Sequence, residues 1–258
     1  MHENDIRFLT SWFGVYTSSF SSENEEVKAN LRYKKEHSLR VRDLMVIFGR
    51  DQQLEQNALF LAEVIGLFHD LGRFKQYATY HTFKDHKSVD HAELGLAVLE
   101  KHQILLGRVS EVEKEIIYTA IRNHNRRIIK ENVQGSTLLF SQMIRDADKI
   151  DILEQIISYY ENPKRTPYLA VEANHQDESY SPEIIQGILS GKKISYTSVK
   201  TPVDIKLIRL SWLLDLNFKI ALEIAEKKQL PKRLRTFIPV TAETLQVFQY
   251  IEQKLSLC

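Results

Sequence analysis

The sequence of 258 residues predicts an all-helical protein. Apolar residues recur at spacings of three and four along several long segments, which is the pattern of helices with one buried face. Glycine and proline are sparse, at nine and six residues, so tight turns are few and long helices are favoured. Hydrophobic residues make up 43% of the chain, which is enough to fill a core. We therefore expect an all-α fold.

Six helices are expected in the first 160 residues. The pair Ser21-Ser22 offers an N-cap for the second helix, and Ser88 offers one for the fourth. Ser110, with a glutamate three residues later, is a capping box for the fifth. Gly72 is expected to close the third helix, as a C-terminal glycine commonly does. The predicted ranges are 5–20, 23–49, 54–69, 89–101, 111–124 and 136–160.

The remaining segments are expected to be loops and C-terminal helices. Residues 73–88 show no helical period and are predicted to form an ordered loop, and residues 161–180 are hydrophilic and irregular. Three further helices are predicted, at 181–191, 204–228 and 241–257, and the stretch 195–200 is either a short strand or a linker. We expect one helical domain over residues 1–258, with the chemistry at about 30–160 and a helical extension at about 161–258.

Composition limits the partners and the compartment. A formal net charge of +1 gives no electrostatic reason to expect nucleic acid as a partner, and the basic residues between 227 and 235 are interpreted as a solvated helix end. Cys258 is the single cysteine, so no intrachain disulfide is expected, which favours a reducing cytoplasm. No stretch of eighteen uncharged apolar residues predicts a membrane span. The apolar helix 204–228 buries either the core or a dimer face, which leaves an oligomer possible.

Six residues are candidate metal ligands. Each lies on, or at the end of, a predicted helix, with apolar residues on the same face. They are His37, His69, Asp70, His91, His124 and Asp148. An ionised carboxylate on an apolar face is costly unless it is paired or bound to a metal. Four imidazoles and two carboxylates form a nitrogen and oxygen cage for two divalent metals, which predicts metal-assisted hydrolysis of a phosphate ester.

In their order along the chain, these segments resemble the HD-domain superfamily of metal-dependent phosphohydrolases. The matching segments are Glu36-His37-Ser38, His69-Asp70-Leu71-Gly72-Arg73, His91-Ala92-Glu93-Leu94-Gly95, Arg122-Asn123-His124-Asn125 and Asp146-Ala147-Asp148-Lys149-Ile150-Asp151. The resemblance covers about residues 30–160 and implies an HD-domain-like helical bundle with additional C-terminal helices.

The resemblance also implies a ligand set and a nucleophile. One metal is expected on His37, His69, Asp70 and Asp148, and Asp70 is expected to bridge to a second metal on His91 and His124. The metals are Fe, Mn, Zn or Mg, and a hydroxide between them is the expected nucleophile. The register of the family favours Asp148 over Asp146 and Asp151, which are expected behind the site or at the surface.

The expected substrate is a small-molecule phosphate ester, with a nucleotide or a related phosphomonoester or diester as its class. Arg73, one turn after Asp70, is expected to act beside Asp70 in catalysis and to contact the phosphate. Further candidates for substrate contact are Gln76, Tyr80, Lys87, Arg122 and Lys149. Phe83 and His81 belong to the same loop, and ordinary loop positions are favoured for His81 and His86.

Two branches of the superfamily are excluded by departures from their patterns. In the HD-GYP branch a His and a Glu follow the site matched by His124, where Asn125 and Arg126 stand here, and no Gly-Tyr-Pro follows. The stringent-response hydrolases typically have four ligands, so the additional His91 and His124 argue against them.

Two alternatives to a phosphohydrolase stay open. The first is a di-iron oxygenase of the same superfamily, because the same six ligands also bind iron for redox chemistry. The second is a non-enzymatic binding or signalling module that has retained the metal site. Loss of turnover on Asp70→Ala is expected of an enzyme, whereas a binding module would keep its partner affinity.

Overall fold

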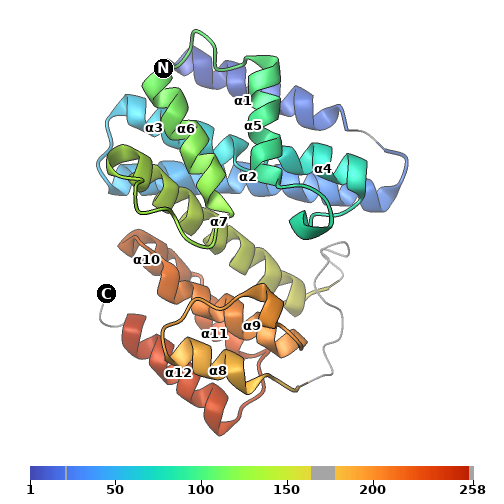
Figure 1. The fold of residues 1–258 in the computed structure, drawn as a ribbon, viewed down its shortest axis with the longest axis vertical. Coiled ribbons are helices and arrows are strands. Elements are labelled where there is room, and N and C mark those ends of the chain that lie inside the picture. Colours follow the sequence, from blue (N-terminus) through green and yellow to red (C-terminus); the bar gives the residue numbers. More distant parts are fainter. Residues whose placement is uncertain (21, 164–177, 256–258) are drawn as a thin grey trace. The chain divides into compact units, whose positions relative to one another are not determined.

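The computed structural model describes residues 1–20, 22–163 and 178–255. Within these ranges every regular element is helical, which confirms the predicted all-α class (Figure 1). Internal contacts divide the chain into two compact units, Met1–Asp151 and Ile152–Cys258. One helix, α7 (Gly135–Glu161), contributes its first part to the first unit and its last part to the second.

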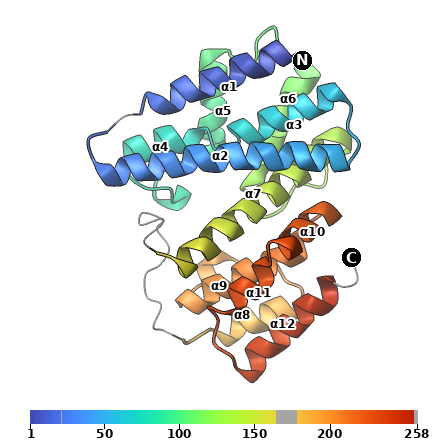
Figure 2. The ribbon, with the colours of Figure 1, turned by 180° about the vertical axis from the view of Figure 1, so that it is seen from behind.

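The first unit is a bundle built around an antiparallel pair of helices. Its elements are α1 (Glu3–Ser18), α2 (Glu25–Asp51), α3 (Gln56–Phe68), α4 (Gly72–Tyr80), α5 (His91–His102), α6 (Glu111–His124) and the first part of α7. Figure 2 shows α3 alongside α2, and these two helices share the most extensive contact in the molecule. The buried ring of Phe13 on α1 meets those of Phe68 and Phe74 edge to face, with centroids 6.1 and 5.9 Å apart. Burial of each such ring contributes about 2–3 kcal/mol to stability.

The predicted loop at residues 73–88 is wrong over its first half. Residues 72–80 form α4, and a short 3₁₀ turn follows at Asp85–Lys87. The sequence pattern did not reveal this helix because, after its first residue, the helix buries only Phe74, Gln76 and Tyr77. The glutamine interrupts the apolar pattern. Gly72 does not close α3 but begins α4.

Gly72 is required where α4 begins because the helices approach closely there. A Cβ atom on Gly72 would lie 2.1 Å from the carbonyl oxygen of His91 and 2.6 Å from the amide nitrogen of Gly95. Both atoms belong to the backbone of α5 and cannot rotate away. Gly72 thus allows the turn that carries Asp70 to lie against the start of α5, which carries His91.

The helix caps differ from the predictions at two of three positions. Asn24, not Ser21-Ser22, caps α2 by accepting from the amides of Glu26 and Val27. Asp90, not Ser88, caps α5. The capping box of Ser110 and Glu113 at α6 is confirmed. Asn, Asp and Ser are nearly equivalent N-caps, so the residue type alone did not decide between neighbours.

The second unit is also built of helices. They are α8 (Pro182–Leu189), α9 (Pro202–Ser211), α10 (Lys219–Lys227), α11 (Leu230–Arg235), α12 (Ala242–Leu255) and the last part of α7. Asp204 is buried at the start of α9, where its carboxylate accepts from the amide and hydroxyl of Ser181 and from the amides of Lys200 and Thr201. This carboxylate joins the first turns of α8 and α9.

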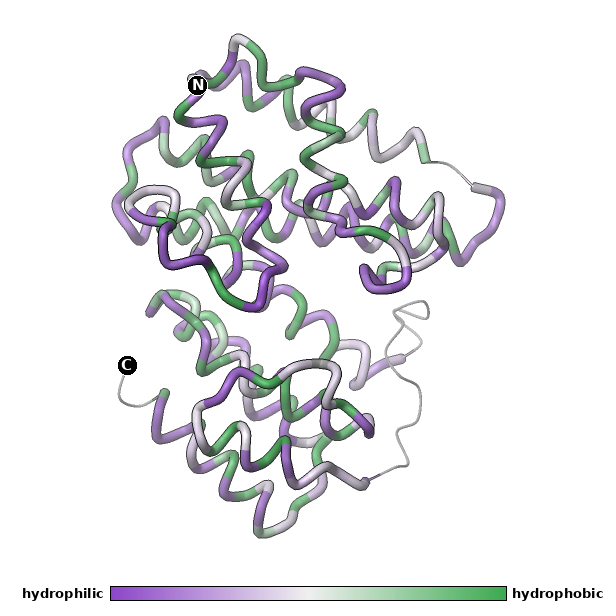
Figure 3. The backbone as a smooth tube through the Cα atoms, viewed as in Figure 1, coloured by the Kyte–Doolittle hydropathy of each residue, from purple (hydrophilic) through white to green (hydrophobic). Residues whose placement is uncertain are grey.

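The single helix predicted at 204–228 is wrong. It is divided into α9, a 3₁₀ turn at Trp212–Asp215 and α10, with extended backbone at Leu216. The apolar period continues across the break because Leu213 is buried on the turn, so the sequence pattern did not reveal it. The stretch 195–200 contains a 3₁₀ turn at 196–198 and no strand. Figure 3 shows hydrophobic and hydrophilic residues alternating along the helices of both units, as expected of amphipathic helices.

Parts of two predictions lie outside the described residues. Most of the irregular segment at 161–180 falls there, and so do the last residues of the helix predicted at 241–257. Within the described ranges, no helix is long and apolar enough to cross a membrane.

Candidate metal centre

The six candidate ligands meet inside the first unit. The helices supply them in chain order: His37 from the middle of α2, His69 and Asp70 from the turn after α3, His91 from the start of α5, His124 from the end of α6, and Asp148 from α7. Their ligand atoms form three overlapping groups, and the atoms within each group lie within 4.8 Å of one another. The structure therefore brings together all six residues that the sequence singled out, although they extend from residue 37 to residue 148.

Helix ends place most of these ligand atoms. His69 is the C-cap of α3 and its amide still donates to the carbonyl of Ile65, while Asp70 lies in the turn before α4. His91 is the first residue of α5 and His124 the last residue of α6. The four histidines and Asp70 are buried, and Asp148, with 18% of its side chain exposed, is the most open of the six.

Asp70 lies between two pairs of histidines. Its Oδ2 is 3.4 Å from Nε2 of His37 and 3.7 Å from Nε2 of His69. Its Oδ1 is 3.2 Å from Nε2 of His91 and 3.7 Å from Nε2 of His124. Each carboxylate oxygen therefore faces one pair of imidazoles, which is the arrangement that a bridging carboxylate needs.

Asp148 joins the first of these pairs. Its Oδ1 lies 3.1 Å from Nε2 of His37 and 3.7 Å from Nε2 of His69. One half of the cluster thus has two nitrogens and two carboxylates, and the other half has two nitrogens and the shared Asp70. The grouping matches the predicted division between two metals, and the assignment of each ligand to one metal stays a prediction.

All four histidines point Nε2 into the cluster because Nδ1 is engaged outside it. Nδ1 of His69 lies 2.8 Å from the carbonyl of Gly66, and Nδ1 of His124 lies 2.6 Å from that of Ile121. A carbonyl only accepts, so both Nδ1 atoms carry the proton. Nδ1 of His37 and of His91 each lie 2.7 Å from a carboxylate, of Asp151 and Asp85 respectively. With Nδ1 carrying a proton, each Nε2 can offer a lone pair to a metal, in the case of His37 once its Nε2 proton has been displaced.

The separations between ligand atoms fit shared cations. Two atoms that each lie about 2.1 Å from one metal are about 3.0–3.4 Å apart at ordinary coordination angles. Nε2 of His37 and His69 are 3.2 Å apart, and Nε2 of His91 and His124 are 2.9 Å apart. Lone pairs that face each other this closely repel unless a cation lies between them. The donor set, rich in imidazole, favours Fe or Zn over Mg.

The charges in the cluster are strongly coupled. Burial raises the pKa of Asp70, but Lys34 and the neighbouring histidines outweigh it and hold that pKa well below the ordinary value. Burial and Lys34 lower the pKa of His37, but hydrogen bonds to the carboxylates of Asp148, Asp151 and Asp70 raise it to about 10. A metal on Nε2 must replace the proton held there, so metal binding is expected to release protons.

Two carboxylates behind the cluster hold the outer nitrogens of histidines. Asp151, buried behind His37, is fixed in turn by Arg40, whose Nε lies 2.6 Å from its Oδ1. Asp85 receives Nδ1 of His91 and is fixed by the side chains of Arg73 and Gln76. Such partners orient metal-binding histidines and increase their basicity.

The residues predicted to contact substrate are divided by the structure into two groups. Arg73 and Gln76 lie beside the cluster, where Nη1 of Arg73 donates to Asp85, to Gln76 and to the carbonyl of Phe83. Gln76 is buried and donates to Asp85, Ser88 and the carbonyl of Val89.

Of the other four candidates, Tyr80, Lys87 and Arg122 are not placed beside the six ligands by their described contacts, and Lys149 lies on α7 next to Asp148 in the chain. Tyr80 and Lys87 are exposed, and Arg122 pairs with Glu93 on the neighbouring helix at 3.0 Å. Lys149 is half-buried on α7. Their roles stay predictions.

Three residues near the ligands were missed by the sequence analysis: Lys34, Arg40 and Asp85. Lys34 lies one turn before His37 on the same helix, and Arg40 lies three residues after it, so the helical period carried a signal for both. Asp85 belongs to the segment that was predicted as loop, and its contact with His91 depends on the fold of that segment.

Comparison with known families agrees with this geometry. Residues 35–159 match the family model of the HD domain, and this range contains all six candidate ligands. Residues 35–159 therefore form a domain of the HD superfamily, whose members are in general metal-dependent phosphohydrolases. Searches of curated proteins and of solved structures gave no match.

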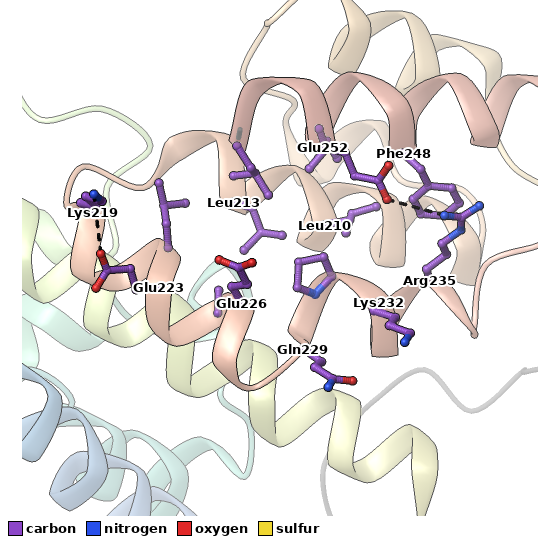
Figure 4. Close-up of a pocket in the computed structure, with 15 residues that line it drawn as sticks. Leu210, Leu213, Lys219, Glu223, Glu226, Gln229, Lys232, Arg235, Phe248 and Glu252 are labelled. Carbon is purple, nitrogen blue, oxygen red and sulfur yellow. Dashed lines mark ion pairs between the residues drawn. The ribbon is translucent and has the colours of Figure 1, made fainter. Parts of the chain in front are cut away.

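The second unit contains a separate pocket of about 670 Å³. Its floor is apolar, with Leu210, Leu213 and Phe248, and charged side chains line its rim, including an ion pair of Lys219 with Glu223 (Figure 4). None of the six candidate ligands lines this pocket. This pocket is therefore distinct from the cluster of the six candidate ligands, which all lie in the first unit.

Proposed function

We propose that the protein is a metal-dependent phosphohydrolase that cleaves a small-molecule phosphate ester. The observation that supports this proposal best is the arrangement of four inward Nε2 atoms around the two oxygens of Asp70. Two divalent metals, when bound there, supply an activated water and polarise the phosphoryl oxygens. Iron, manganese and zinc suit the donor set best.

The protein's own residues hold and orient these parts. Asp151, Asp85 and the carbonyls of Gly66 and Ile121 fix the four imidazole rings, so the ligand atoms are arranged before substrate binds. The burial of the histidines limits access of bulk water and strengthens every charge interaction inside. Asp148, as the most exposed ligand, marks the side from which substrate approaches.

A nucleotide is the proposed substrate class. Positive charge from Lys34 and Arg73 lies next to Asp70, at 2.7 and 3.4 Å, where phosphate oxygens would need it. Aromatic rings adjoin this charge: Phe83 lies 5.6 Å from Nζ of Lys34, and Tyr33 stacks on His37. Such rings suit a base or sugar. A cytoplasmic location, with neither membrane nor nucleic acid as a partner, belongs to the same proposal.

The first test is the metal content of the purified protein, measured by plasma mass spectrometry. It is combined with hydrolysis of a generic phosphodiester and a panel of nucleotides, with and without chelator. We expect about two metals per chain and phosphate release that the chelator abolishes. A matched pair of variants on one helix, His91→Gln and His102→Gln, serves as control, because only His91 contributes to the cluster.

The other outcomes distinguish the alternatives. Two irons without phosphate release would favour the di-iron oxygenase, which uses the same ligands. A protein without bound metal would exclude both enzymes.

A further inference from the structure

One cation, Lys34, lies directly beside the candidate ligands. Its Nζ lies 2.7 Å from Oδ2 of Asp70, and only 12% of its side chain is exposed. We propose that Lys34 contacts the phosphate of the substrate, and that Nη1 of Arg73 serves to position His91 through Asp85. This inference rests on the proposed phosphohydrolase function.

The ammonium of Lys34 has N–H donors that are not used by the described residues. An ammonium carries three N–H donors, and Asp70 is the single acceptor that the described residues offer Lys34 within hydrogen-bond distance. Around it lie the rings of Tyr33 and Phe83, with centroids 6.0 and 5.6 Å from Nζ, which leave those donors without competing acceptors. The flexible stem of a lysine also lets its charge follow a ligand that enters the site.

Arg73 is also close to Asp70, with its buried Nε 3.4 Å from Oδ1 and without a hydrogen-bond partner of its own, but one of its terminal nitrogens is committed to the protein. Its Nη1 donates to the side chains of Gln76 and Asp85 and to the carbonyl of Phe83. These bonds hold Asp85, which in turn orients His91. A phosphate contact through Nη1 would disrupt this chain of bonds. Arg73 is therefore a positioning residue that acts on His91 through Asp85.

The place of Lys34 fits the approach of substrate. Lys34 contacts the oxygen of Asp70 that faces His37 and His69, which is the half of the cluster that Asp148 joins. Asp148 is the most exposed ligand, so a phosphoryl group that arrives there meets the ammonium of Lys34. A compact cation at this place can neutralise a non-bridging oxygen as charge develops.

The test compares four variants of the full chain: Lys34→Met, Lys34→Arg, Arg73→Met and Lys35→Met. Lys35 is the matched control, because it is the next lysine on α2 and, among the described residues, its amine reaches only Ser18 at 3.5 Å. Each protein is loaded with the metal found in the purified wild type. Binding of inorganic phosphate is measured by calorimetry and metal content by plasma mass spectrometry, with KM and kcat for the best substrate of the panel.

We expect Lys34→Met to weaken phosphate binding by about tenfold or more, as the loss of a charged hydrogen bond does, at unchanged metal content. KM should rise with it, and Lys34→Arg should restore part of the affinity. Arg73→Met should instead lower metal content, because His91 loses its orientation. Lys35→Met should match the wild type in every measurement.

Three outcomes would overturn the inference. If Lys34→Met loses metal while its loaded fraction binds phosphate as the wild type does, Lys34 is only a partner of Asp70. If Arg73→Met weakens phosphate binding at full metal content and Lys34→Met does not, the two roles are reversed. A wild type that holds metals but neither binds nor releases phosphate contradicts the proposed function itself, and the inference with it.

Discussion

Two buried aspartates, one in each unit, show how surroundings decide what a carboxylate can do. Asp204 in the second unit accepts hydrogen bonds from three backbone amides and one hydroxyl at the starts of two helices. Asp70 in the first unit instead faces four imidazole nitrogens and the ammonium of Lys34. Backbone donors satisfy a carboxylate permanently and leave it inert, whereas imidazole lone pairs require a cation. The surroundings of Asp70 therefore suit a cation, whereas those of Asp204 join the starts of two helices.

The largest expected effect separates these two aspartates directly. Asp70→Ala removes the carboxylate that faces both pairs of histidines, so we expect loss of bound metal and a fall in phosphate release on the order of a thousandfold or more. Asp204→Ala should leave the metal content of the folded protein unchanged. Metal analysis and turnover of the two variants check this. Equal metal content in the Asp70 variant and the wild type would show that Asp70 is not a ligand.

Two glycines extend the comparison to close packing. Gly72→Ala would place a methyl group 2.1 Å from a backbone oxygen of α5, which must shift together with His91. We expect it to destabilise the first unit by about 3 kcal/mol, the upper range for overpacking, and to lower metal content. Gly187→Ala in α8 would meet only the flexible side chain of Ile194 at 3.0 Å, while alanine favours the helix by about 1 kcal/mol. Thermal melts should show a large loss for the first variant and almost none for the second.

A smaller effect on metal affinity is expected for Asp85, which lies behind the cluster. Asp85→Ala removes the acceptor of Nδ1 of His91, and loss of such a partner lowers metal affinity by about 10–100-fold. Asp90→Ser is the control, because serine keeps the N-cap of α5 and leaves His91 its partner. Competition with a chelator measures both affinities. Equal affinities in the two variants would mean that His91 does not depend on Asp85 for its orientation.

The ligand cluster was predictable because its signal is local. Each candidate ligand lies on a helix, or just after its end, and the apolar face of that helix points inward, so the residue types and the helical period together indicate the site. Lys34 and Arg40 could have been predicted by the same reasoning, because both lie within one turn of His37 on α2. Asp85 was not, because its contact with His91 exists only after α4 and the turn that follows it have formed.

The helices that were missed show the limit of the helical period as a signal. In α4 a buried glutamine interrupts the apolar stripe, and hydrogen bonds to Asp85, Ser88 and Val89 compensate its burial. Between α9 and α10 the opposite happens, because a buried leucine on the 3₁₀ turn continues the stripe through a break. Both errors arise from tertiary contacts that a periodic pattern does not contain.

The smallest effect concerns stability and its dependence on pH. Burial raises the pKa of Asp204, but hydrogen bonds from Ser181, Lys200 and Thr201 outweigh it and hold that pKa below its ordinary value of 3.8. A lowered pKa in the folded state means that ionised Asp204 stabilises the fold above about pH 4, and that this stabilisation is lost as the pH falls through the folded pKa. We expect Asp204→Asn to lower the free energy of unfolding of the second unit by about 1–2 kcal/mol at pH 7. Urea unfolding at pH 7 and at pH 3 measures the difference between variant and wild type, which should shrink at the lower pH. A difference that does not change with pH would mean that the charge of Asp204 contributes nothing, and that its two oxygens act only as neutral acceptors.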